Sequence, residues 1–237
     1  MRERLLSHPL LLSHLLMPFT AFLIVAVFLE YSCVDIWLAD SIYRWSGNTW
    51  RYRDAWLTAV LIHEGGRDLV GIAAAALLVM TMLSLSFSRL EPWRRILVFL
   101  VVSTLGCGLL INILKSLTHV DCPWDILRYG GSHPYVRNFH PLPAFMEAGA
   151  CFPAGHASAA YSWFGLYYAA RILNPRLRLI VLAGVLFAGA VFGIGQQLRG
   201  AHFISHDLWT LGICWILTTL IAFLLLPPPP ANIFAPA

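Results

Sequence analysis

Long apolar stretches are the feature that most constrains how this chain of 237 residues can fold. A helix that crosses a bilayer needs about 20 mostly apolar residues. Backbone groups inside a bilayer find no water to bond, so spanning segments of this kind form helices. Six such segments occur, at about 15–29, 70–87, 96–114, 157–173, 179–195 and 208–226. The sequence therefore predicts an all-α integral membrane bundle of six transmembrane helices.

The composition agrees with a membrane location. Hydrophobic residues make up 59% of the chain and charged residues only 12%, whereas a typical soluble domain is about 25% charged. No internal repeat and no soluble domain is apparent. We therefore expect a single membrane-embedded domain over residues 1–237, with a disordered tail from about residue 227, where a run of prolines ends the last helix. The first apolar stretch is expected to be a retained span, because no small-residue cleavage site follows it cleanly.

Basic residues predict the orientation of the chain. Dense lysine and arginine in short loops mark the cytoplasmic side of a membrane. Such residues precede the first span and fill the second–third and fourth–fifth loops: Arg2, Arg4, Arg89, Arg94, Arg95, Arg171, Arg176 and Arg178. Both termini are then expected in the cytoplasm, and the longer loops 30–69 and 115–156 face outward. With a net charge of +4 and no basic run, no nucleic-acid partner is expected.

The two outward segments differ in character. Residues 41–67 are polar and aromatic, which predicts a helix or loop lying at the membrane interface. Residues 116–152 are rich in the turn formers proline and glycine. This second loop also holds Cys122 and Cys151, and in an oxidising compartment these two thiols could form a disulfide.

Ionisable residues gather in three clusters at the outward ends of the predicted spans. Lys115 ends the third span, and His156 opens the fourth. The third cluster lies between the fifth and sixth spans and contains Arg199, His202, His206 and Asp207. Charged residues near membrane depth are costly and usually functional. The predicted topology brings all three clusters to one rim of the bundle, where they could form a site.

The sequence around His156 favours the binding of an anion. Residues 151–156 read Cys-Phe-Pro-Ala-Gly-His and continue as an apolar helix. Proline and glycine before a helix leave its first backbone N–H groups free, and such an end binds anions. A histidine in that place can donate a proton to a departing oxygen. In the third cluster, Asp207 could hold a nearby imidazole in one tautomer, as the acid does in a histidine-based triad.

The three clusters together resemble the signature of the type 2 phosphatidic acid phosphatase superfamily, which includes membrane lipid phosphatases. That signature reads Lys-x6-Arg-Pro, then Pro-Ser-Gly-His, then Ser-Arg-x5-His-x3-Asp. The positions that agree are Lys115, Pro123, Pro153, Gly155, His156 and His202. Their order and spacing extend the resemblance over residues 115–207 of a six-span chain.

Other signature positions differ. They are Cys122 for arginine, Ala154 for serine, Gly195 and Gln196 for the Ser-Arg pair, and His206 for aspartate. Because Asp207 directly follows His206, either side chain could orient the nucleophile. Arg199 or Arg128 could supply the guanidinium that the two missing arginines provide elsewhere in the family. A disulfide between the two loop cysteines could fix the loop that the lost arginine no longer orders.

The resemblance implies a mechanism through a phosphohistidine. His202, which we favour over His206 on the alignment, attacks phosphorus, while His156 protonates the leaving oxygen and then activates water. Positive groups hold the phosphoryl oxygens. The groups expected in this role are Lys115, Arg199, Arg128 and the backbone N–H groups of Ala154 and Gly155. Neither a metal nor a cofactor is implied.

The function implied by the resemblance is a lipid phosphate or pyrophosphate phosphatase at the periplasmic face of a bacterial-type inner membrane. Its partners are then the bilayer and a lipid such as undecaprenyl pyrophosphate, phosphatidic acid, phosphatidylglycerol phosphate or a lipid A phosphate. A phosphotransferase that passes the group to a lipid acceptor is the close alternative. A transporter or non-catalytic membrane protein fits less well, because transporters place polar groups at mid-membrane, often in repeats. No oligomeric state is predicted.

Overall fold

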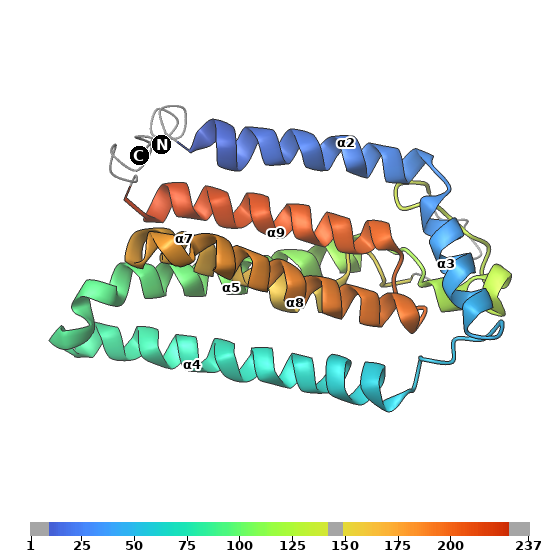
Figure 1. Cartoon of the computed structure of the whole chain (residues 1–237), viewed down its shortest axis with the longest axis horizontal. Coiled ribbons are helices and arrows are strands. Elements are labelled where there is room, and N and C mark those ends of the chain that lie inside the picture. The colour runs from blue at the N-terminus through green and yellow to red at the C-terminus, as the bar shows by residue number, and fades with distance from the viewer. Residues whose placement is uncertain (1–9, 142–148, 228–237) are drawn as a thin grey trace.

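The computed structural model describes residues 10–141 and 149–227 and shows a bundle of long helices lying side by side (Figure 1). The described residues contain no β-strand, so the predicted all-α class is confirmed. The α-helices are α2 (Met17–Tyr31), α3 (Val34–Trp45), α4 (Gly66–Ser86), α5 (Glu91–Thr118), α6 (Gly155–Tyr161), α7 (Gly165–Leu173), α8 (Arg178–Leu198) and α9 (Ile204–Leu225). The tail that was expected to be disordered lies, from residue 228 on, outside the described residues.

Within the described residues, five helical segments are long and apolar enough to cross a membrane: Leu11–Tyr31, Trp56–Ser86, Ser88–Asp125, Pro175–Leu198 and Ile204–Leu225. They correspond to the first, second, third, fifth and sixth predicted spans. The remaining prediction, at 157–173, corresponds to α6 and α7, which are joined by the 3-10 turn η6 (Ser162–Phe164). With this interrupted helix the bundle has the six elements that the sequence predicts.

The second span begins much earlier than predicted. A π-helical stretch, η2 (Trp56–Gly65), runs directly into α4, so one helix extends from Trp56 to Ser86. Part of the segment predicted to lie at the interface, residues 41–67, is therefore the outer end of a membrane helix. The start of this span was predicted too late because ionisable residues at 63–68 interrupt the apolar pattern.

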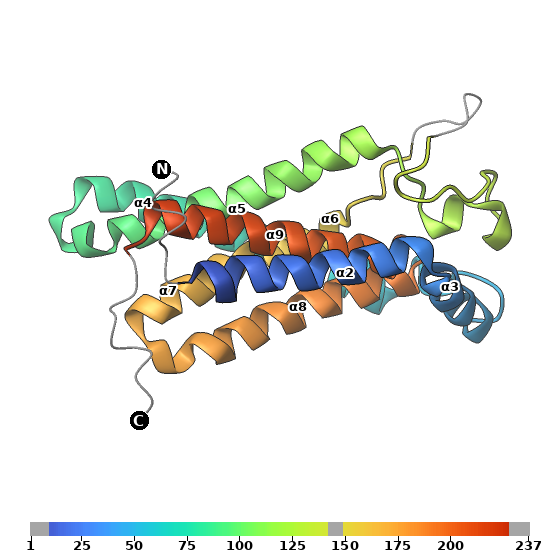
Figure 2. The same ribbon diagram turned by 90° about the horizontal axis from the view of Figure 1, so that it is seen from above.

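The turns and loops that connect the helices lie at the two ends of the bundle. The turn between α4 and α5 and the turn between α7 and α8 lie at one end, and both are rich in arginine (Figures 1 and 2). Helix α3 and the loop after α5 lie at the other end (Figures 1 and 2). The short basic turns and the long loops are thus on opposite sides, as the predicted topology requires. Assignment of the basic end to the cytoplasm stays a prediction from the charges.

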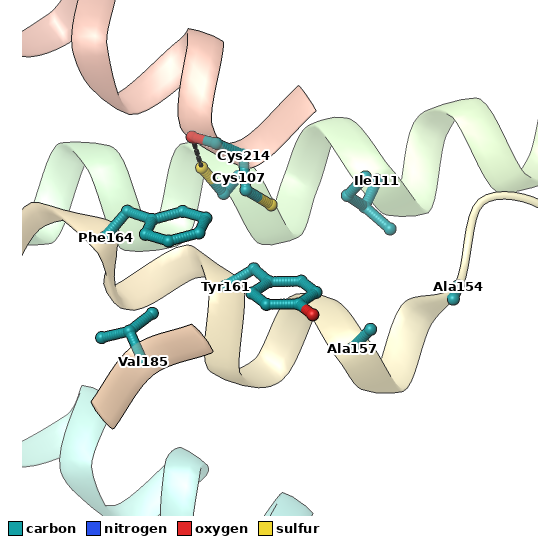
Figure 3. Packing of buried hydrophobic residues seen from close by; sticks show 8 residues of the cluster. All are labelled: Cys107, Ile111, Ala154, Ala157, Tyr161, Phe164, Val185 and Cys214. Atoms are coloured by element: carbon teal, nitrogen blue, oxygen red, sulfur yellow. Dashed lines mark hydrogen bonds between the residues drawn. The ribbon is translucent and has the colours of Figure 1, made fainter. Parts of the chain in front are cut away.

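Helix α6 lies inside the bundle, where it contacts α5, α8 and α9. A buried cluster surrounds it (Figure 3): Cys107, Ile111, Ala154, Ala157, Tyr161, Phe164, Val185 and Cys214. Small residues let membrane helices approach closely. Gly189 of α8 shows this, because a Cβ atom built there would overlap the Tyr161 ring. This packing fixes the start of α6, and with it His156, relative to three other helices.

We predict that Gly189→Ala destabilises the protein, because the added methyl group has no space beside Tyr161. Overpacking of a well-packed contact costs about 1–3 kcal/mol, which thermal unfolding of the purified protein in detergent would detect as a lower melting temperature. Gly184→Ala, on the same helix, is the matched control, because a Cβ atom at Gly184 meets nothing within 4 Å. Equal melting temperatures for the two variants would contradict this account of the packing.

Candidate active site

A cavity of about 220 Å³ lies between the second span, α5, α6 and α8. It is lined by Ile62, His63, Arg67, Asn112, Lys115, Gly155, His156, Ala159, Phe192 and Gln196. The polar lining side chains are amides, histidines and basic groups, and no carboxylate of the described chain lines the cavity. A cleft lined by one sign of charge concentrates ligands of the opposite sign. The cavity therefore suits an anionic ligand.

Four histidine rings lie close to one another, and two of them, His63 and His156, line this cavity. The ring centroids of His63 and His156 are 4.0 Å apart. Those of His156 and His202 are 6.4 Å apart, and those of His202 and His206 are 5.7 Å apart. The rings come from η2, the start of α6, the α8–α9 turn and the first turn of α9. The structure thus brings together all three histidines singled out in the sequence and adds His63.

His202 is buried, with 4% of its surface exposed. Its Nδ1 atom lies 3.5 Å from Nδ1 of His206, which is itself completely buried. Burial, together with the neighbouring His206 ring, lowers the pKa of His202 well below its usual value. The ring is therefore neutral at pH 7, and a neutral imidazole has a nitrogen lone pair free for attack. His202 is not among the lining residues, and its ring lies 6.4 Å, between centroids, from that of His156, which lines the cavity.

Asp207 faces α8. Its Oδ2 atom accepts a hydrogen bond of 2.6 Å from Nε2 of Gln197. The carboxylate also packs so closely on Gly193 that a Cβ atom built there would lie 2.7 Å from it. Of the two residues considered for orienting the nucleophile, His206 is therefore the one whose ring lies beside His202.

Lys115 and the first turn of α6 share one wall of the cavity. Nζ of Lys115 lies 3.6 Å from the position of a Cβ atom built on Gly155, so the ammonium group lies beside the first residue of α6. Ala154 is arranged differently, because its N–H donates to the carbonyl of His206 at 3.3 Å. Its carbonyl accepts from the Thr210 hydroxyl at 3.0 Å. The Ala154 N–H, which was expected to bind phosphate, is thus engaged in joining α6 to α9.

Neither of the arginines expected to replace those of the signature lines the cavity. Arg128 forms two bonds of 2.7 Å from its guanidinium to the carboxylate of Asp40 and tethers the outer loop to α3. Arg199 donates from Nε to the carbonyl of Arg53 at 2.8 Å and from Nη1 to Oε1 of Gln196 at 3.4 Å. Arg199 therefore reaches the cavity only through Gln196.

A family model described as the PAP2 superfamily matches residues 96–226, which is more than half of the chain. The chain belongs to the PAP2 superfamily. Its structure is similar to the crystal structure of the first transmembrane PAP2-type phosphatidylglycerolphosphate phosphatase from Bacillus subtilis, with a TM-score of 0.55 and 19% sequence identity. That match covers 87% of this chain and 92% of the Bacillus chain and shows a shared fold. A comparison with curated proteins found no match.

In this PAP2 protein a disulfide occupies the place of the first signature arginine. Cys122 and Cys151 are bonded to each other, with Cα atoms 5.2 Å apart. The bond joins the loop after α5 to the segment before α6, so it connects the helix of Lys115 to that of His156. Position 122 can therefore hold the loop, but it cannot supply a positive charge.

His63 and Arg67 are the ionisable cavity residues that the sequence analysis does not identify. The PAP2 signature does not contain them, and the predicted second span began after them. The signal that could have located them is the sequence His-Glu-Gly-Gly-Arg-Asp at 63–68, a group of ionisable residues at the outward end of a span. Ionisable groups at the end of a span indicate a functional site there, as they do at the three clusters of the signature.

We predict that the double variant Cys122→Ser and Cys151→Ser lowers the melting temperature of the protein, because its loop gains freedom in the unfolded state. Native disulfides typically contribute about 2–4 kcal/mol, and thermal unfolding in detergent measures the loss. Cys33→Ser, at an exposed and unpaired cysteine of the described chain, serves as the control. A double variant as stable as the control would show that the disulfide does not hold this loop.

Proposed function

We propose that this PAP2 protein is a lipid phosphate or pyrophosphate phosphatase that works through a phosphohistidine. The observation that carries the proposal is the pair His156 and His202, with ring centroids 6.4 Å apart beside a basic cavity. Reactive approach requires about 3–3.5 Å between reacting atoms, and proton transfer requires about 2.6–3.2 Å. A phosphoryl group bound next to both rings would have the nucleophile on one side and the acid on the other.

The proposed reaction has two steps. His202 attacks phosphorus, the bond to the lipid oxygen breaks, and His156 gives its proton to that departing oxygen. His156 then removes a proton from water, whose oxygen attacks phosphorus as the bond to His202 breaks. The products are the dephosphorylated lipid and inorganic phosphate, and both histidines return to their starting states.

Charge placed around the phosphoryl group supports both steps. Phosphoryl transfer depends chiefly on positioning and on electrostatic stabilisation of the equatorial oxygens. Lys115 lines the cavity next to Gly155, the first residue of α6. Gln196, which accepts a hydrogen bond from Arg199, lines the cavity from α8 at the position of a signature arginine. These groups are suited to hold the oxygens while His202 and His156 act along the line between them.

Three features support a lipid substrate at an outward face. The cavity has apolar walls at Ile62, Ala159 and Phe192 beside its polar groups, which suits a molecule with a head group and a chain. The nearby disulfide suits an oxidising compartment such as the periplasm. The arginine-rich turns lie at the opposite end of the bundle, as expected for the cytoplasmic side of a bacterial inner membrane.

A lipid phosphotransferase is the second candidate. The observation that favours it is the burial of His202, which is 4% exposed and is not among the residues that line the cavity. A phosphohistidine so shielded from bulk water would last until a lipid acceptor took the place of water. The chemistry of the first step is the same for both candidates.

We predict that the purified protein releases phosphate from lipid phosphates in detergent containing EDTA, and that His156→Ala and His202→Ala abolish release. A panel of phosphatidic acid, phosphatidylglycerol phosphate and undecaprenyl pyrophosphate would be assayed, first with water alone and then with a lipid acceptor. His140→Ala, an exposed histidine of the outer loop, is the control. Full activity of the His202→Ala protein would refute the assignment of the nucleophile.

The orienting residue is tested separately. We predict that His206→Ala lowers kcat by at least about a hundredfold, toward the loss seen when the orienting member of a triad is replaced. Asp207→Asn preserves the shape of a side chain that bonds to α8. The fall in kcat for this variant should therefore stay within about tenfold, which corresponds to one hydrogen bond. The reverse order of the two effects would assign the orienting role to Asp207.

A further inference from the structure

The outer end of the second span forms a wall of the cavity that the PAP2 signature does not describe. We propose that His63 and Arg67 on this wall bind the phosphate oxygens of the substrate, in place of the signature arginine that is absent at position 122. This inference rests on the proposed phosphatase function and adds a fourth binding segment to the three of the signature. The ligand group is the phosphate monoester or diphosphate of the lipid.

The first argument is that the other arginines near the site are engaged elsewhere. Arg128 is bonded to Asp40, and Arg199 is bonded to the Arg53 carbonyl and to Gln196. Among the described residues, Arg67 supplies the guanidinium that lines the cavity. A guanidinium matches phosphate with two parallel hydrogen bonds, which a lysine cannot do.

The second argument is the position of the two side chains. His63 and Arg67 are four residues apart on one continuous helix, so they lie on the same helical face, and both line the cavity. The His63 ring is 4.0 Å from the His156 ring, measured between centroids. A phosphate in contact with the proposed acid His156 is therefore within reach of His63.

The third argument is that Arg67 is held only weakly by its own neighbour. Its guanidinium lies 3.2 Å from the carboxylate of Asp68, and the two side chains are 65% and 64% exposed. Exposed pairs of this kind contribute little, at most about 1 kcal/mol. A phosphate that carries two negative charges and lies in the cavity competes well for this guanidinium.

The fourth argument is a set of polar atoms without partners on the facing walls. Nδ1 of His156 and Nε2 of Gln196 are buried and make no hydrogen bond to any described residue. Buried polar atoms nearly always have a partner. Both residues line the same cavity as His63 and Arg67, so phosphate oxygens at this place would meet donors from the second span, α6 and α8 together.

The experiment compares kcat and KM for phosphate release by Arg67→Ala, His63→Ala and the conservative variants Arg67→Lys and His63→Gln. Loss of a charge-assisted hydrogen bond corresponds to a fall of about ten- to a hundredfold, and we expect it in kcat/KM, with most of it in KM. Lysine and glutamine should restore part of the loss, because each keeps a donor. Arg51→Ala and His140→Ala, at exposed outer positions, are the matched controls.

A second measurement uses inorganic phosphate as the probe. In the His202→Ala background, phosphate should raise the melting temperature, and the added Arg67→Ala change should remove most of that rise. If wild type is active and depends on His202, while the four variants keep kcat/KM within twofold and still bind phosphate, the inference is overturned and the phosphatase function stands. If no lipid is hydrolysed but phosphate binding depends on Arg67, the binding wall stands and the proposed function fails.

Discussion

The burial of α6 among α5, α8 and α9 is the contact on which the rest of the structure depends. Helices in a bilayer gain nothing from the hydrophobic effect when they associate, so they rely on close packing and on hydrogen bonds between helices. Here the Thr104 hydroxyl of α5 donates to the Ser162 carbonyl at 3.3 Å. The Thr210 hydroxyl of α9 donates to the Ala154 carbonyl. A helix of seven residues is thereby positioned from both ends.

The same packing explains how the site can be built from distant parts of the chain. His156 opens α6, while His202 and His206 frame the start of α9, and each segment contacts the others through buried residues. The outer loop adds a covalent connection through its disulfide. Charged side chains such as Arg128 serve this framework, which leaves the cavity lined by groups that are neutral or basic.

Much of this arrangement could be predicted from the sequence, because apolar length and motif spacing are local properties. The six helical elements and the convergence of Lys115, His156 and His202 on one rim follow from them. His63 could not be found in this way, because hydropathy ends a span at its first charged residues although the helix continues. The engagement of Arg128 with Asp40 was equally hidden, since it joins residues 88 apart in sequence.

The second span is the helix least enclosed by the bundle. Only 11% of its most apolar window is buried, the lowest value among the five spans. It packs mainly on α5 and reaches α8 through η2. A phosphate head group bound between Arg67 on this helix and Lys115 on α5 would bridge the two helices through ionic contacts. Removal of the phosphate from the lipid would break those contacts, so the reaction itself would weaken the binding of the lipid product.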